Sequence, residues 1–261
     1  MRNCLITGAG RGIGAATAKE LAGSGWRLFV NYRSNVDAAE HLLAEIREHG
    51  GEVVGCRADV SSRPEVERIL ATVRATTESL DCLIHNAGAP FVRRPARNLD
   101  WDRDMLPQLE TSCRGLLNCL QVFQPLLHKG SLVLVMLTSA LFIHDGSDTG
   151  DYLAGKGALY GLCRAWHRDL ARLGVRLALV SPGATKTELL LRSFGQSQRH
   201  LELFAARLAG SGIASPEEVA KHLLVIIEEM LSAVTSEAEP VHFIVSKDRC
   251  WRLASGPREV L

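Results

Sequence analysis

The first residues of the chain contain a short apolar run, a glycine-rich turn and a helical pattern in immediate succession. Residues 4–7 are the apolar run, Gly8, Gly12 and Gly14 lie in the turn, and residues 15–22 have the helical pattern. Glycines let a buried strand turn directly into a helix, and they also let the backbone approach a phosphate group at the helix start. This feature favours an α/β fold with a phosphate-binding turn. A plain tight connection is the alternative, because the spacing is not a strict GxGxxG.

Strand and helix patterns alternate along the rest of the chain. Strand patterns cover residues 27–32, 52–56, 80–85, 132–137, 175–180 and 240–245, and helical patterns cover 36–49, 64–77, 101–127, 152–174, 187–210 and 216–232. An interruption of the 101–127 helix near Pro107 is the alternative to a continuous helix there. Near-continuous apolar strands that alternate with helices are typical of a parallel sheet covered on both faces. Because we find no linker or repeat, we predict one α/β domain over residues 1–261.

The composition excludes several classes of protein. The 261 residues carry a formal net charge of +1, which gives no reason to expect nucleic-acid or anionic-membrane binding. The longest apolar run, residues 132–143, is too short to span a bilayer, and Met1 lies too close to the first strand for a signal peptide. The seven cysteines contain no CxxC pair, and no His/Cys cluster has metal-ligand spacing. We therefore expect a cytoplasmic protein with reduced thiols and no metal.

Tyr152 and Lys156 lie four residues apart in a helical pattern, so their side chains share one helical face. A phenol has an ordinary pKa of about 10, and a nearby ammonium favours the phenolate and lowers that pKa. Ser139 ends an apolar strand pattern thirteen residues before Tyr152, and its hydroxyl can hydrogen-bond a substrate oxygen. Together these three side chains predict a proton-transfer site for a carbonyl and alcohol pair.

Ligands of open parallel sheets bind at the carboxyl ends of the strands. The residues that follow predicted strands, and that we therefore expect at one edge, are Gly8, Arg33, Asp59, Asn86, Ser139 and Pro182.

The tip of the second strand carries Arg33 and has no acidic residue before Asp37. In a dinucleotide-binding fold an acid at this tip binds the ribose 2′-hydroxyl of NAD, and a basic residue accommodates the 2′-phosphate of NADP. Arg33 and Arg11 of the glycine turn can together bind a phosphate. The alternative is that both are solvated surface arginines.

Taken together, these motifs resemble those of the classical short-chain dehydrogenase/reductase (SDR) family. The motifs that carry the resemblance occur in family order over nearly the whole chain: Thr7-Gly8-(x)3-Gly12-Ile13-Gly14, Asn86-Ala87-Gly88, Ser139, Tyr152-(x)3-Lys156, and Pro182-Gly183 followed by Thr187. The resemblance implies a Rossmann-type doubly wound sheet of about seven strands, mostly or wholly parallel, with helices on both faces. It also implies an NADP(H) cofactor.

The resemblance also implies roles for individual residues. Tyr152 is expected to be the general acid/base, Lys156 to lower its pKa and bind the nicotinamide ribose, and Ser139 to orient the substrate carbonyl. Asp59 is expected to contact the adenine. The full set of expected cofactor-binding residues is Gly8, Arg11, Gly12, Ile13, Gly14, Arg33, Asp59, Val60, Asn86, Ala87, Gly88, Tyr152, Lys156, Pro182, Gly183 and Thr187.

The chain departs from the family pattern at two places. Ser112, counted back from Gly115, stands where the family usually has an asparagine that supports a water chain to the lysine, so we expect an impaired or rewired proton relay. The carboxyl-terminal signature of many members is also missing. We nevertheless expect a homotetramer or homodimer, because two long helices carry more apolar residues than one sheet face can cover. These include Leu116, Leu120, Leu159, Leu162 and Trp166.

The main functional hypothesis is NADPH-dependent reduction of a ketone to a secondary alcohol, or the reverse. The substrate side is expected to be formed by residues 91–97, 141–150 and a helical segment at about 187–211. Apolar residues there suggest apolar walls, although a helix face packed on the core is equally consistent with them. An exposed loop pair is the favoured reading of His144 and Asp145, and selection of a polar substrate is the alternative.

Four arginines could receive an anionic or carrier-protein-bound substrate, although a solvated face is the commoner arrangement: Arg93, Arg94, Arg97 and Arg192. His85 is expected to end a strand without a chemical role. Two further functions stay open on the sequence alone. One is a regulatory protein that binds NADP(H) without turnover, and the other is dehydratase or epimerase chemistry on the same fold.

Overall fold

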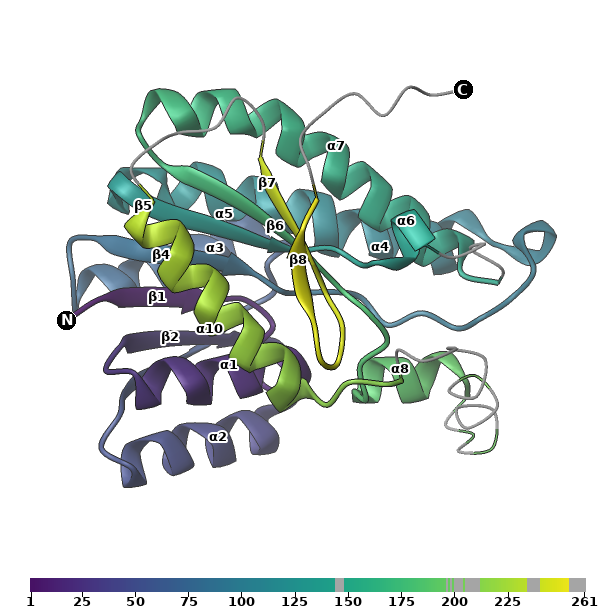
Figure 1. Ribbon diagram of the computed structural model, residues 1–261, viewed down its shortest axis with the longest axis horizontal. Helices are drawn as coiled ribbons and strands as arrows, with labels where there is room; N and C mark the ends of the chain where they lie inside the picture. Colours follow the sequence, from purple (N-terminus) through teal and green to yellow (C-terminus); the bar gives the residue numbers. More distant parts are fainter. Residues whose placement is uncertain are drawn as a thin grey trace.

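Eight strands form a single sheet at the centre of the computed structural model, which describes residues 1–143, 148–195, 197, 199, 204, 212–233 and 240–253 (Figure 1). Their spatial order is β3-β2-β1-β4-β5-β6-β7-β8. The parallel strands are β1 (Asn3–Ile6), β2 (Arg27–Tyr32), β3 (Glu52–Arg57), β4 (Leu80–His85), β5 (Leu127–Met136), β6 (Arg176–Pro182) and β7 (Val241–Val245). The short β8 (Cys250–Arg252) pairs antiparallel with β7.

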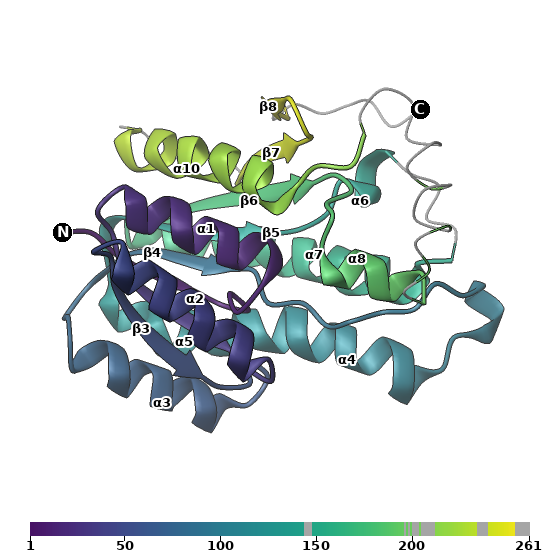
Figure 2. The same ribbon diagram turned by 90° about the horizontal axis from the view of Figure 1, so that it is seen from below.

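Helices cover both faces of the sheet (Figure 2). One layer consists of α1 (Gly12–Gly23), α2 (Val36–Glu48) and α10 (Pro216–Ser232), and the other contains α3 (Arg63–Arg74), α5 (Gly115–Phe123) and α7 (Gly150–Arg172). This arrangement confirms the doubly wound, Rossmann-type α/β fold that the sequence predicts.

Alternate residues of each central strand enter different cores. Cys4 and Ile6 pack with the α1, α2 and α10 layer, whereas Leu5 between them packs with the α3, α5 and α7 layer. Because both faces are covered, consecutive inner positions of such a strand are apolar, and the strand has a near-continuous apolar run. Leu116, Leu120 and Leu159 also belong to the second core and are fully buried within the subunit. Their apolar character therefore needs no partner subunit.

The segment that follows residue 100 is not one regular helix but a succession of short helical pieces. It consists of the π-helix η2 (Trp101–Met105), α4 (Leu106–Leu109), the π-helix η3 (Glu110–Arg114), α5 and the 3-10 turn η4 (Gln124–Leu126). Pro107 stands in the first turn of α4, where its missing N–H does no damage, but it prevents a regular helix from running through. Leu127 already belongs to β5.

The carboxyl-terminal part of the chain adds a strand that the sequence did not indicate. Ser246 N donates to the Arg249 carbonyl at 2.8 Å, and this turn folds β8 back onto β7. The sheet therefore has eight strands and not about seven. Helix α10 is capped by Ser215, which forms a reciprocal capping box with Glu218.

Only part of the helical pattern at 187–210 lies within the described residues, where it forms α8 (Glu188–Ser193). The hypothesis about His144 and Asp145 lies outside the described residues. In the part of the chain that the structure describes, no helix is long and apolar enough to cross a membrane. The same part contains no cluster of three or more potential metal ligands.

The order of the strands reverses between β1 and β4. The chain runs outward from β1 to β3 and then crosses back to β4 on the other side of β1. In such sheets the carboxyl ends at the reversal point form a crevice for ligands. The residues that follow these two strands, Gly8 and Asn86, therefore mark the candidate site.

Candidate active site

The glycine turn after β1 needs its glycines because other backbone lies against it. Gly8 has φ +61, and a Cβ there would lie 2.7 Å from the Ala87 Cα. A Cβ on Gly14 would lie 2.6 Å from Nδ2 of Asn86 and 2.8 Å from the Ala9 Cα. The turn is thus packed directly on the segment that follows β4, and larger residues would force the two strand ends apart.

Asn86 and Thr7 bind these two strand ends together. Nδ2 of Asn86 donates to the carbonyl oxygens of Thr7 and Gly8, each at 3.0 Å. The Thr7 hydroxyl oxygen accepts the backbone N–H groups of Asn86 at 3.0 Å and Ala87 at 3.1 Å. The crevice between β1 and β4 is therefore held by reciprocal hydrogen bonds.

Helix α1 begins directly after the turn and has no side-chain cap at Arg11, its N-cap residue. The N–H groups of its first turn therefore point out of the helix without a capping side chain, which is the arrangement that binds phosphate. The Arg11 side chain itself pairs with Glu188 of α8, and Glu188 also pairs with Arg192. Arg11 and Arg33 thus pair with different acidic residues, Glu188 and Asp59, and their joint binding of a phosphate stays a prediction.

A cavity of about 270 Å³ lies at the carboxyl ends of the strands. The sequence-predicted residues that line it are Gly8, Arg11, Gly12, Ile13, Asn86, Gly88, Ser139, Tyr152, Lys156, Pro182, Gly183 and Thr187. The predicted residues that do not line it are Gly14, Arg33, Asp59, Val60, Ala87 and Ser112. The glycine turn and the side chains of Ser139, Tyr152 and Lys156 thus line the same cavity.

Tyr152 lies in the first turn of α7, and its ring stacks on that of Phe91. Burial raises the pKa of Tyr152, and a hydrogen bond with the Thr138 side chain lowers it by less. Tyr152 is therefore a neutral phenol at neutral pH. Sequence reasoning missed Thr138, a buried cavity residue beside Ser139. The sequence signal that could have identified Thr138 is its hydroxyl, which lies next to that of Ser139 after the apolar run 132–137.

Lys156 is buried below Tyr152, with its Nζ 6.0 Å from the centroid of the tyrosine ring. Nζ donates to the Met136 carbonyl at 2.7 Å, and burial lowers the pKa of Lys156 to about 8. The sequence predicted that the ammonium lowers the pKa of Tyr152, but in the structure the pKa of Tyr152 is raised. Desolvation is the largest effect on the pKa of the phenol, and the Lys156 ammonium is directed at a backbone carbonyl.

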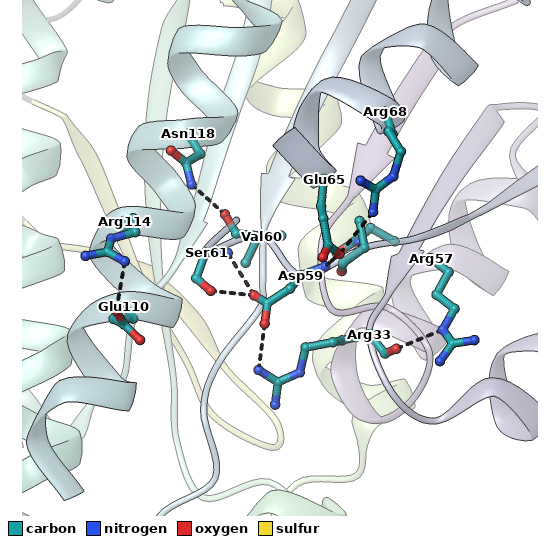
Figure 3. Close-up of polar contacts among 12 residues, drawn as sticks. Arg33, Arg57, Asp59, Val60, Ser61, Glu65, Arg68, Glu110, Arg114 and Asn118 are labelled. Atoms are coloured by element: carbon teal, nitrogen blue, oxygen red, sulfur yellow. Dashed lines mark hydrogen bonds and ion pairs between the residues drawn. The ribbon is translucent and has the colours of Figure 1, made fainter. Parts of the chain in front are cut away.

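A second polar cluster lies at the ends of β2 and β3, outside the cavity (Figure 3). Arg33 Nη1 pairs with Asp59 Oδ2 at 3.0 Å, and Asp59 Oδ1 accepts the backbone N–H of Ser61 at 2.9 Å and its hydroxyl at 2.7 Å. Burial raises the pKa of Asp59, but the bonds from Ser61 and Arg33 bring it below its usual value. Asp59 is therefore an anion that holds Arg33 in place.

Arg57 extends this cluster and was missed by the sequence reasoning. It pairs with Tyr32 in the register of β3 and β2, and its Nε donates to the Arg33 carbonyl at 3.3 Å (Figure 3). Arg57 thus adjoins the main chain of Arg33 at the tip of β2, and β2 itself carries no acidic residue. Val60, in the same figure, has its carbonyl bound by Asn118 Nδ2 at 2.9 Å.

Ser112 lies in the π-helix η3 and is buried, away from the cavity lining. Its carbonyl oxygen lies 3.0 Å from Nε2 of His85, the last residue of β4. His85 ends β4, as predicted, and its ring also joins this strand to η3.

One side of the cavity is mainly apolar. Phe91, Leu189, Leu190 and Phe204 line it, together with Arg93. The Arg93 guanidinium lies over the rings of Phe194 and Phe204, at 4.5 Å and 4.9 Å from their centroids. Of the four arginines in the sequence hypothesis, Arg94 pairs with Asp104 and Arg192 with Glu188.

A family model described as "Enoyl-(Acyl carrier protein) reductase" matches residues 8–242 of the chain. A curated relative, the 3-oxoacyl-(acyl-carrier-protein) reductase FabG of Staphylococcus epidermidis, is 31% identical over 185 residues, 70% of this chain and 74% of the relative. The chain is a short-chain dehydrogenase/reductase. This confirms the family that the sequence motifs indicated, and it makes the protein an SDR oxidoreductase with ketoreductase relatives.

Other similar proteins cover more of the SDR chain. An uncharacterized oxidoreductase of Escherichia coli, YgfF, is 29% identical over 240 residues, 90% of this chain and 96% of the relative. A short chain dehydrogenase from Burkholderia cenocepacia, solved in complex with NADP, is 26% identical with a TM-score of 0.79 and covers 88% of this chain and 92% of its own. A dehydrogenase/reductase from Sinorhizobium meliloti has the same fold at a TM-score of 0.80 and 24% identity, over 92% of this chain and 93% of its own.

Proposed function

We propose that this SDR reduces a ketone to a secondary alcohol with NADPH, or catalyses the reverse reaction. The observation that carries the proposal is the shared cavity, in which Tyr152, Lys156 and Ser139 face the same space as the glycine turn. A proton donor and a dinucleotide-binding turn in one cavity are what hydride transfer to a carbonyl needs. The ketoreductase relatives support the same reaction.

The residues of the site fit an NADP(H) molecule. The uncapped start of α1 and the close glycine turn suit its pyrophosphate, as in dinucleotide-binding folds generally. Arg33 and Arg57 would hold the 2′-phosphate, and Asp59 and Val60 would lie near the adenine. Asn86, Gly88, Pro182, Gly183 and Thr187 would border the nicotinamide half.

Tyr152 would give its proton to the carbonyl oxygen during reduction. Its raised pKa keeps the proton on the phenol at neutral pH, which suits a general acid. Ser139 would hydrogen-bond the same oxygen, so that the charge developing there meets two donors. The nicotinamide, when bound, supplies the hydride.

Lys156 would keep positive charge close to the developing phenolate and bind the nicotinamide ribose. The Met136 carbonyl orients its ammonium, which makes the position of that charge a property of the folded protein. Ser112 does not reach the cavity, so any relay through it would run behind Lys156.

The substrate would be an apolar carbonyl compound, either free or attached as a 3-oxoacyl thioester to a carrier protein. The rings of Phe91 and Phe204 and the side chains of Leu189 and Leu190 support the apolar part. The chain would act as one domain, and the described part of the segment at about 187–211, which is α8 and Phe204, would contribute to substrate binding.

The test is spectrophotometric turnover of NADPH with a panel of free ketones and 3-oxoacyl thioesters. We expect consumption of NADPH that depends on the ketone and yields the secondary alcohol. Binding of NADPH without turnover of any carbonyl compound would favour the regulatory protein. Loss of water or inversion of a centre without net NADPH consumption would favour dehydratase or epimerase chemistry.

A further inference from the structure

His85 is a buried polar side chain at the end of β4 and makes two contacts on opposite sides of its ring. It is 1% exposed. Nε2 lies 3.0 Å from the Ser112 carbonyl oxygen, and Nδ1 lies 3.4 Å from the Thr7 hydroxyl oxygen. A histidine with both nitrogens occupied inside a protein core links the two elements that supply its partners.

The partners determine which ring nitrogen carries the proton. The Ser112 carbonyl can only accept, so Nε2 must be the donor and Nδ1 the acceptor. The Thr7 oxygen already accepts two backbone N–H groups, and its own proton has the His85 Nδ1 and the Ile84 carbonyl within 3.4 Å. Burial lowers the pKa of His85 to about 3, and the nearby Lys156 charge adds to the effect, so the ring remains neutral.

The Ser112 carbonyl belongs to a part of the chain that lies under the catalytic turn of α7. A Cβ on Gly155, the residue before Lys156, would lie 2.8 Å from the Gln108 Cβ. Cys113 Sγ lies 4.0 Å from the Gly155 carbonyl oxygen. The segment from Gln108 to Cys113 is therefore in direct contact with the backbone that carries Lys156.

This segment also contains a π-helix, which is less regular than an α-helix and often occurs at functional sites. Gly115 at its end is close to His85, because a Cβ there would lie 3.3 Å from Cε1 of the histidine. The histidine ring thus packs against this turn and hydrogen-bonds it at the same time, which specifies its position relative to β4.

We propose that His85 is a positioning residue for the reductase site. Its Nε2–H holds the Ser112 turn against the end of β4, and this turn supports Gly155 and so determines where Lys156 stands relative to the glycine turn after β1. The proposal rests on the proposed ketone reduction only for its activity readout.

Two conservative variants separate the contacts of the ring. His85→Gln places an amide nitrogen near the position of Nε2 and can still donate to the Ser112 carbonyl. His85→Asn is shorter and can reach only the Thr7 side. Val73→Ala serves as a stability control, because it removes a buried side chain from α3 on the same core without touching the site.

We expect kcat of His85→Asn to fall by about 10–100-fold, as for other losses of support behind catalytic groups. NADPH affinity should fall by less, because Lys156 would supply only the contact to the nicotinamide ribose. His85→Gln should recover most of that loss, and Val73→Ala should lower the melting temperature without lowering kcat. Equal kcat in His85→Asn and wild type, or equal losses in the Asn and Gln variants, would overturn the proposal.

The wild-type protein provides a readout that needs no variant to fold. NMR of the histidine ring nitrogens should show His85 protonated on Nε2 and unchanged from about pH 5 to about pH 9. A ring that titrates in this range, or is protonated on Nδ1, contradicts the proposal. Tyr152→Phe separates the two ideas: retained turnover in that variant refutes the ketone reduction, whereas an unaffected His85→Asn beside an inactive Tyr152→Phe refutes the role of His85 alone.

Discussion

The ring of Phe91 lies face to face with the ring of Tyr152, with centroids 4.5 Å apart and planes inclined by 14°. Phe91 is buried and belongs to the extended segment after β4, whereas Tyr152 begins α7. The stacking holds the phenol in the plane that brings its hydroxyl to Thr138. The position of Tyr152, the proposed acid, thus depends on Phe91, a residue that takes no part in the reaction.

Replacing Phe91 should therefore harm catalysis more than binding. We expect Phe91→Leu to lower kcat by about 10-fold, because misplacement of a catalytic group is costly, with NADPH affinity little changed. Val92→Ala is the matched control, since Val92 is the next residue and is 48% exposed. Steady-state kinetics of the two variants decide the matter, and similar effects in both would contradict the role given to the ring.

Removing the phenolic hydroxyl should abolish most of the turnover. Tyr152→Phe is expected to lower kcat by about 10²–10⁴-fold, the usual contribution of general acid catalysis. NADPH binding, measured by fluorescence titration, should stay near the wild-type value because the ring remains. Thr138→Val should have a smaller effect, since Thr138 contacts the hydroxyl but is not the proposed proton donor. Near wild-type turnover in Tyr152→Phe would exclude the mechanism.

Because of Lys156, the reductase activity should fall at alkaline pH while the free energy of unfolding rises. Burial holds the pKa of Lys156 at about 8, below the ordinary lysine value of about 10.4, so the ammonium and with it the reductase rate are lost above about pH 8. The unfolded chain still binds the proton up to about pH 10.4, so this residue's contribution to the free energy of unfolding rises between those values.

Lys156→Met tests both responses. At pH 7 this variant should be inactive but more stable than the wild type, by up to about 3 kcal/mol for the pKa difference, less the lost bond to Met136. The advantage should shrink as the pH approaches about 10. Thermal melts at several pH values measure it. A constant difference between the two proteins across this range would show that the buried charge has no such cost.

The arginines at the tip of β2 should determine the preference for NADPH. Loss of one charge-assisted phosphate contact costs about 1.5–3 kcal/mol, so Arg33→Ala should weaken NADPH binding about 10-fold or more and leave NADH binding nearly unchanged. Arg57→Ala should act in the same direction. Arg74→Ala, which removes an exposed charge from the end of α3, is the control. Tighter binding of NADH than NADPH by the wild type would refute the preference.

We expect a homodimer or homotetramer. The structure leaves fewer residues available for the subunit interface than the sequence suggested. Leu116, Leu120 and Leu159 are internal, which leaves Leu162 and Trp166 of α7 as partly buried candidates. Light scattering at micromolar concentration should show an oligomer, and replacing both candidates with glutamate should shift it towards the monomer. Leu173→Glu, at the exposed end of the same helix, should not. A monomeric wild type would contradict the expectation.

Short-range patterns were sufficient for the parts of the site that lie on one element. Tyr152 and Lys156 share a face because they are one helical turn apart, and the glycine turn follows directly from the strand before it. Boundaries failed where the local signal was mixed. β5 begins at Leu127, five residues before the predicted start, and this start was missed because residues 128–131 are polar or glycine and show no strand pattern. β8 was missed because it is too short to be recognised.

The sequence by itself determined the doubly wound fold and the sheet edge that carries Gly8, Asn86 and Ser139, because periodicity and strand ends are local properties. Only the tertiary structure decided the partners of the charged and polar groups. Arg11 meets Glu188 across 177 residues, and His85 meets Ser112 across 27. Likewise, burial and not the nearby ammonium dominates the pKa of Tyr152. Hydrogen bonds and desolvation depend on how separate elements pack together, and no local spacing of residues specifies that.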